Sequence, residues 1–129
     1  MPGQIDPNLG AAFVTSPQVS YKDVSIPAGA SGISGDVDLG PYRLGGIAIP
    51  STWVSATSVT FQVSADGTTW YNLFDEVGSE VSITVAASRI ARVPLAEWLP
   101  VRYMRVRSGT SGAPVNQTNS PTITLMLVA

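Results

Sequence analysis

Residues 57–67 read TSVTFQVSADG, and this stretch decides the fold class. Val59, Phe61 and Val63 alternate with Ser, Thr and Gln, which is the period-two pattern of a strand with one buried face. Asp66-Gly67 follows directly, and both residue types tolerate the backbone conformations of a tight hairpin turn. The stretch therefore predicts a half-buried strand that enters a β-hairpin.

The same alternation recurs between residues 19 and 129. Clear runs cover 81–85, 103–107 and 122–128, and weaker runs cover 19–26, 43–50, 70–74 and 90–95. Turn-forming pairs such as Ser34-Gly35 and Ser111-Gly112 separate the runs. The one helix candidate is a single turn at 95–99, which ends at Pro100. We expect residues 19–129 to form one all-β domain, a β-sandwich or jelly roll of about eight antiparallel strands.

Residues 1–18 are predicted to form an extended N-terminal arm. Pro2, Pro7 and Pro17 interrupt this segment, and proline fixes the backbone and removes hydrogen-bond donors. The sizeable apolar residues of the arm, which we expect to contact a neighbouring subunit, are Ile5, Leu9, Phe13 and Val14. The alternative is a terminus without a fixed structure.

The composition excludes several functional classes. A net charge of −2 provides no basic field for phosphates, so we expect no nucleic-acid partner. No apolar stretch approaches the ~20 residues that span a bilayer, and residues 1–20 do not resemble a secretory signal. We therefore expect no membrane partner and synthesis in a cytoplasm. Only 12% of the residues are charged, which suits either a surface covered by neighbours in a permanent assembly or a stable uncharged sandwich surface.

The residue types needed for common catalytic sites are also missing. The chain contains no histidine and no cysteine, which removes imidazole bases, thiol nucleophiles and most metal ligands. Lys22, the only lysine, lies beside Asp23 on a predicted surface strand, where a structural role is favoured. Asp36 and Asp38 lie among glycines, which favours a solvated loop over a calcium site. We expect a protein without enzymatic activity and without a cofactor.

One predicted strand carries candidate contact residues on its outward face. Tyr103, Arg105 and Arg107 are expected to point outward, where they could grip a carboxylate, a sugar or a neighbouring subunit. The alternative is that arginines on an exposed strand discourage edge-to-edge aggregation. Met126 and Val128 are apolar residues on an otherwise polar face, and we expect a neighbour to cover them.

Two tryptophans are candidates for stacking on sugar rings. Trp53 and Trp98 each lie near a proline in a loop-like segment. The alternative is that they pack in the core or close one end of it, as tryptophans in small sandwiches commonly do.

Two families share parts of this pattern. Residues 59–70, VTFQVSADGTTW, resemble a discoidin-type jelly roll, in which a strand ends in a Ser-x-Asp-Gly-x-x-Trp hairpin, and residues 101–107, VRYMRVR, are similar to its penultimate strand. This resemblance implies a jelly-roll fold. The ligand-binding loops of that family have no recognisable counterpart here. The alternative function that follows is a carbohydrate-binding module, on a tail structure that adheres to a host surface.

A longer resemblance covers residues 44–129. Five segments follow one another here: the Ser-Ala-Asp-Gly hairpin, ITVAASR at 83–89, RVRSGT at 105–110, APVNQ at 113–117 and a final apolar strand. This arrangement is similar to that of small structural proteins of tailed-bacteriophage virions. That resemblance implies a decoration or cement protein, assembled in the host cytoplasm and located in the virion. Its expected partners are the major capsid protein or other virion proteins and further copies of itself, and a trimer is compatible with shell symmetry.

Overall fold

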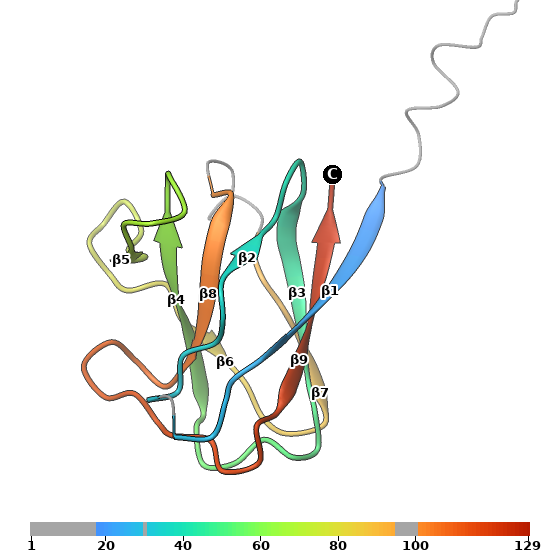
Figure 1. The fold of residues 1–129 in the computed structure, drawn as a ribbon, viewed down its shortest axis with the longest axis vertical. Helices are drawn as coiled ribbons and strands as arrows, with labels where there is room; N and C mark the ends of the chain where they lie inside the picture. Colours follow the sequence, from blue (N-terminus) through green and yellow to red (C-terminus); the bar gives the residue numbers. More distant parts are fainter. Residues whose placement is uncertain (1–17, 30, 95–100) are drawn as a thin grey trace, which may run out of the picture.

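The computed structural model describes residues 18–29, 31–94 and 101–129, and these form two facing antiparallel sheets (Figure 1). Sheet A contains, in spatial order, β1 (Val19–Ser25), β9 (Thr122–Val128), β3 (Arg43–Ile49) and β7 (Arg89–Arg92). Sheet B contains β2 (Val37–Asp38), β8 (Tyr103–Ser108), β4 (Ser58–Ser64) and β5 (Tyr71–Asn72), and β6 (Ile83–Thr84) also pairs with β4. The predicted all-β sandwich is confirmed.

The chain crosses repeatedly between the two sheets. β1 belongs to sheet A, β2 to sheet B, β3 to sheet A and β4 to sheet B, and the last three strands alternate again. Strands that are neighbours in a sheet are therefore mostly distant in sequence; β1 pairs with β9 over its whole length, from Val19 opposite Val128 to Ser25 opposite Thr122. The described part of the chain contains no helix that is long and apolar enough to cross a membrane.

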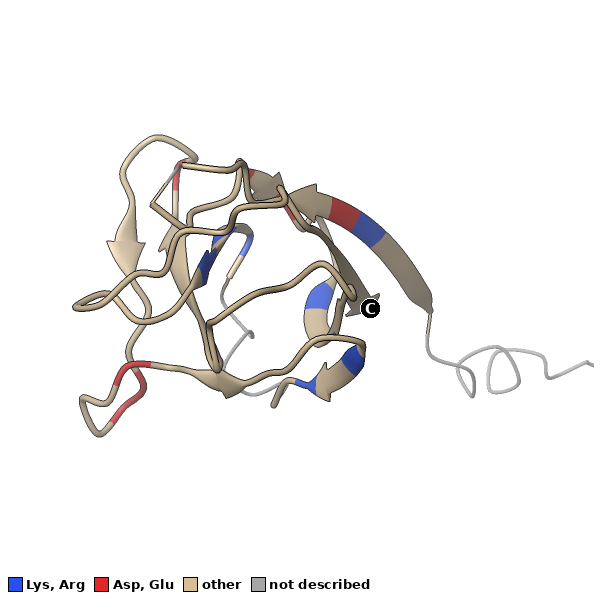
Figure 2. Cartoon of the chain, turned by 90° about the horizontal axis from the view of Figure 1, so that it is seen from below, with Lys and Arg blue, Asp and Glu red and all other residues tan. Residues whose placement is uncertain are grey.

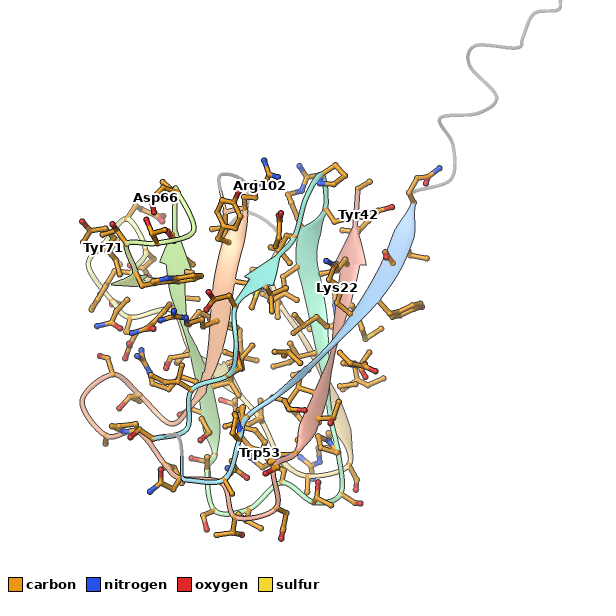
Figure 3. All side chains as sticks on the ribbon, viewed as in Figure 1. Lys22, Tyr42, Trp53, Asp66, Tyr71 and Arg102 are labelled. Carbon is orange, nitrogen blue, oxygen red and sulfur yellow. The ribbon has the colours of Figure 1, made fainter. Side chains whose placement is uncertain are left out.

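The core lies between the sheets and follows the alternation of the strands. Phe61 of β4 is fully buried, and Leu125 of β9 and Ile47 of β3 are buried in the facing sheet. Full burial of a side chain such as Phe61 contributes about 2–3 kcal/mol. Trp53 is 5% exposed and lies near one end of the sandwich, and its indole N–H donates to the Ala56 carbonyl (2.8 Å; Figure 3).

A buried glutamine joins two loops near the Trp53 end. The Gln117 side chain is fully buried, accepts a hydrogen bond from the Val54 N–H (3.0 Å) and donates to the Val54 carbonyl (2.8 Å). The amide thus pairs with both backbone groups of one residue, as a neighbouring strand would. This contact holds together segments that are far apart in the sequence.

Most predicted strands occur where the alternation placed them. β9 spans residues 122–128 as predicted, and β4 begins one residue after the predicted run. Two expectations need correction. The segment of Asp36 and Asp38 was expected to be a loop, but residues 37–38 form β2, a short edge strand on β8. The hairpin after β4 is not a two-residue turn, since residues 65–70 separate β4 from β5 and only Gly67 has positive φ (+82°).

The loop after β4 is held by side-chain acceptors. Asp66 Oδ1 accepts hydrogen bonds from the backbone N–H groups of Thr68 and Thr69 (both 2.9 Å) and from the Ser64 hydroxyl. These donors stabilise the ionised carboxylate and hold the pKa of Asp66 far below its usual value. The Ser-x-Asp-Gly sequence therefore specifies a side-chain-capped loop.

Candidate functional site

The outer face of sheet B carries the predicted residues of β8. Tyr103, Arg105 and Arg107 share this face, but the charge of Arg105 is matched within the protein. Its Nε donates to Asp36 Oδ1 (2.6 Å), Nη1 donates to Gln62 Oε1 (3.3 Å), and the guanidinium lies 4.0 Å from the centre of the Trp70 ring. Trp70 packs on the sheet surface by a cation–π contact.

Arg107 requires a correction, because its side chain is buried and not available to a partner. It is only 4% exposed and donates three hydrogen bonds, each 3.0 Å long, to Thr60, Asn72 and Glu80. Burial lowers the pKa of the Arg107 guanidinium, and the Glu80 carboxylate opposes this shift. Periodicity placed the residue on the correct face, but residues 72 and 80 come from a different hairpin and cover it. Arg107 is a structural residue.

The two aspartates of the β2 segment each meet an arginine. Asp38 accepts a bidentate contact from Arg102 (3.0 and 3.3 Å), and this pairing together with the Gly40 N–H lowers the pKa of Asp38. Arg102 also lies over the Tyr103 ring, 5.1 Å from its centre. The Lys22 ammonium donates to the Asp38 carbonyl (2.9 Å), which ties edge strand β1 to β2. These charged groups have partners within the protein.

The outer face of sheet A is different, because it holds an apolar groove. The groove has a volume of about 440 Å³. Its lining residues are Val19 and Tyr21 of β1, Met126, Leu127 and Val128 of β9, Gly45 of β3, Arg92 of β7, and Val93 and Pro94. Met126 and Val128 were predicted contact residues, and the structure places them together in this groove. The strand register sets Tyr21 opposite Met126, Met126 opposite Gly46 and Gly46 opposite Arg92.

Glycine in β3 keeps the groove deep. The strand register is irregular between Leu44 and Gly46, and Gly46 lies between Met126 and Arg92. A Cβ atom at Gly46 would lie 3.5 Å from Met126 Sδ and 3.4 Å from the Ala91 carbonyl oxygen, in ordinary contact.

Beyond the groove, the outward side chains of β1 and β9 are polar and bond to each other. Thr124 donates to Asp23 Oδ1 (2.7 Å), and the hydroxyls of Ser25 and Thr122 are 3.1 Å apart. On β1 and β9, the apolar part of the face is therefore confined to the half near the N-terminal end of β1. Figure 2 shows that charged positions are sparse over the described chain.

The sequence prediction missed three residues of this region. Val19 and Tyr21 are each 62% exposed, and Ile90 of β7 is 64% exposed on the same face as Arg92. Each is an apolar residue at an outward position of its strand. That signal was readable within each weak run, but only the strand order shows that β1 and β7 belong to the same sheet and present these residues on one face.

The remaining predicted residues divide into two groups. Trp53 is buried, so its ring is not presented to a sugar, and its prediction as a stacking residue is wrong for this conformation. Trp98 and the arm residues Ile5, Leu9, Phe13 and Val14 lie outside the described residues.

A second apolar pocket, of about 280 Å³, lies at the β4–β5 end and is lined by Val63, Ser64, Ala65, Tyr71, Leu73 and Val101. Tyr71 at this pocket is 67% exposed (Figure 3).

Comparison with known proteins adds no assignment. No protein-family model matches the chain, and no curated protein matches it. Among the described residues, no group of three or more acidic, His or Cys side chains could hold a metal ion. The apolar groove of sheet A is therefore the feature from which a function can be argued.

Proposed function

We propose that this protein is a non-enzymatic assembly protein that docks through the apolar groove on the outer face of sheet A. The observation that carries this proposal is the exposure of Val19, Tyr21 and Ile90 on one sheet face that also holds a groove lined by Met126 and Gly45. Contiguous apolar surface with a concave centre is typical of a protein interaction site. Arg102, Arg105 and Arg107 at sheet B, in contrast, already pair with Asp38, Asp36 and Glu80.

The assembly that we propose is the virion of a tailed bacteriophage, where the protein would decorate or cement the capsid. The resemblance of residues 44–129 to virion structural proteins supports this, as does the low charge of the chain. The strand order supports a jelly roll, since β1-β9-β3-β7 faces β2-β8-β4-β5 and the chain alternates between the sheets. Such a protein stabilises a shell because it binds the assembled lattice better than free capsid subunits.

The test is co-sedimentation of the purified protein with capsids of the phage that carries the gene, prepared without this protein. Tyr21→Glu places a charge in the groove, and Tyr71→Glu is a matched control, since both tyrosines are similarly exposed, on different sheets. We expect Y21E to weaken capsid binding at least tenfold, or about 1.4 kcal/mol, and Y71E to bind as the unmodified protein does. Capsids that never retain the unmodified protein would refute the proposal.

A second candidate function is carbohydrate binding, and the exposed Tyr71 beside the 280 Å³ pocket favours it. An exposed aromatic ring beside a pocket is a common platform for a sugar ring. Tyr71→Ala would then abolish binding on a glycan array while Y21E leaves it intact. An array on which no glycan is retained would remove this alternative.

A further inference from the structure

We propose that the groove of sheet A is filled by the N-terminal segment, residues 1–17, of a second copy of this chain. The inference rests on the proposed docking role of the groove and names what enters it. Three observations support it: the chemistry of the segment, the place where the segment joins the domain, and an unpaired arginine atom beside the groove.

The chemistry of the segment matches the groove. Residues 1–17 contain one charged side chain, Asp6, and no lysine or arginine. Their sizeable apolar side chains are those of Ile5, Leu9, Phe13 and Val14. An apolar chain with few charges can enter a groove formed by valine, tyrosine and methionine side chains at little desolvation cost.

The charges of this face are complementary to the segment. Arg92 lines the groove, and Arg43 lies opposite Val128 and therefore on the same face. The Nε atom of Arg43 is buried and has no hydrogen-bond partner among the described residues. A buried donor without a partner costs about 1–3 kcal/mol. An extended segment lying across the sheet presents backbone carbonyls, and Asp6 a carboxylate, that can accept from Arg92, and from Arg43 if its side chain turns outward to pair its Nε.

The segment joins the domain beside the groove. The Gln18 carbonyl accepts a hydrogen bond from the Ala129 N–H (2.9 Å), so residue 18 continues the pairing of β1 with β9. Val19, the next residue, lines the groove. Four strands at about 4.8 Å spacing are about 14 Å across, and 17 extended residues reach about 56 Å. The segment is long enough to leave one copy and cross the sheet of another.

The direction in which the segment joins β1 favours a second copy over the chain's own groove. The Gln18 carbonyl is held in the strand pairing by the Ala129 N–H, so the segment joins the domain in line with β1. To enter its own groove, which lies alongside β1, the segment would have to reverse direction before residue 18, whereas the groove of a second copy requires no reversal. In an extended segment, Ile5, Leu9 and Phe13 lie on the same side and can face the groove of a second copy together.

The segment of each copy would enter the groove of another copy, either reciprocally in a two-fold dimer or head-to-tail around a ring. The expected product is a closed oligomer in which every groove is filled. The groove would then support capsid binding indirectly, because it holds together the oligomer that the capsid lattice receives as one unit.

Photo-crosslinking tests which segment enters the groove. A benzoylphenylalanine replaces Tyr21 in the full-length chain, and in a control chain it replaces Tyr71. Labelled (¹⁵N) and unlabelled chains are unfolded, mixed and refolded together before irradiation. We expect covalent dimers in which residues 1–17 of one isotope are attached to position 21 of the other, and no such product from position 71. Attachment within a single chain, or to any other segment, would overturn the inference.

Association measurements separate this inference from the proposed function. In the full-length chain, Leu9→Asp with Phe13→Asp places charges on apolar positions, and Gln4→Asp with Thr15→Asp places the same charges on polar positions. By analytical ultracentrifugation, we expect the first pair and Y21E each to weaken self-association at least tenfold, and the second pair to leave it unchanged. Retained self-association in the L9D/F13D chain, or a protein that stays monomeric, overturns the arm exchange. If the arm exchange is overturned but Y21E still loses capsid binding, the groove remains a docking site for a partner other than the N-terminal segment.

Discussion

Replacement of Arg107 by methionine is expected to destabilise the protein by about 3 kcal/mol. The guanidinium is 4% exposed and donates to Thr60, Asn72 and Glu80. The substitution therefore leaves a carboxylate and two polar acceptors without this hydrogen-bond donor. Removal of one partner of a buried ion pair costs about 3–5 kcal/mol. Glu80 is 16% exposed, and water can hydrate part of the carboxylate that has lost its arginine, which places the expected cost at the lower end of this range.

Urea unfolding followed by tryptophan fluorescence measures this cost. With a slope of about 1.5 kcal/mol per molar urea, a loss of 3 kcal/mol lowers the midpoint by about 2 M. Arg107→Met combined with Glu80→Gln should be less destabilised than R107M alone, because the double variant holds no stranded charge. Arg102→Met is the control, since its ion pair with Asp38 is solvent-exposed and its loss should leave the midpoint unchanged. An R107M midpoint equal to that of R102M would refute the assignment of Arg107 as a structural residue.

Three further predictions concern the loops, and thermal unfolding followed by circular dichroism measures each. Gly29 and Gly32 have nearly equal φ angles (+76° and +75°), but a Cβ at Gly32 would lie 2.5 Å from the Val115 carbonyl oxygen while Gly29 faces open space. Gly32→Ala should therefore cost about 1–3 kcal/mol more than Gly29→Ala, and equal costs would contradict the geometry. Gln117→Leu leaves the Val54 N–H unpaired, because the Val54 carbonyl still accepts from the Ala56 N–H (2.7 Å), and should cost about 1–3 kcal/mol; an unchanged midpoint would show that water replaces the amide. Because the folded-state pKa of Asp66 lies below its ordinary value of 3.8, ionised Asp66 stabilises the fold above about pH 4 and this contribution disappears as the pH falls. Asp66→Asn should lower the melting temperature at pH 7, and the difference from the unmodified protein should narrow toward pH 2; a difference independent of pH would contradict the assignment.

The strands were predictable where side chains alternate over several residues. In residues 122–128 every second side chain, at 123, 125 and 127, is a large aliphatic one, and β9 has those bounds. β2 was not predictable, because two residues between glycines carry no periodic signal and form a strand only where β8 offers its edge. The conformation of the six-residue loop before β5 was also not predictable, because it depends on which backbone N–H groups donate to the Asp66 carboxylate.

The candidate site shows the same division. The sequence showed that Met126 and Val128 are apolar residues on a polar face. That a neighbour covers them stays a prediction. The burial of Arg107 was not visible, because the groups that cover it lie 27 and 35 residues away in the chain. Trp53 looked like a loop residue beside a proline, and only the packing of the loop against the core placed its ring inside.

By itself, the sequence determined the fold class, the faces on which most side chains lie and the shortage of catalytic residue types. These properties follow from local periodicity and composition, which do not depend on the partner of each strand. The tertiary structure alone decided which strands became neighbours, and therefore that Val19, Tyr21, Met126 and Ile90 share one surface. Strand order is a non-local property, because β1 and β9 pair although nearly the whole chain lies between them in the sequence. The groove exists because that order places the glycines of β3 beside β9.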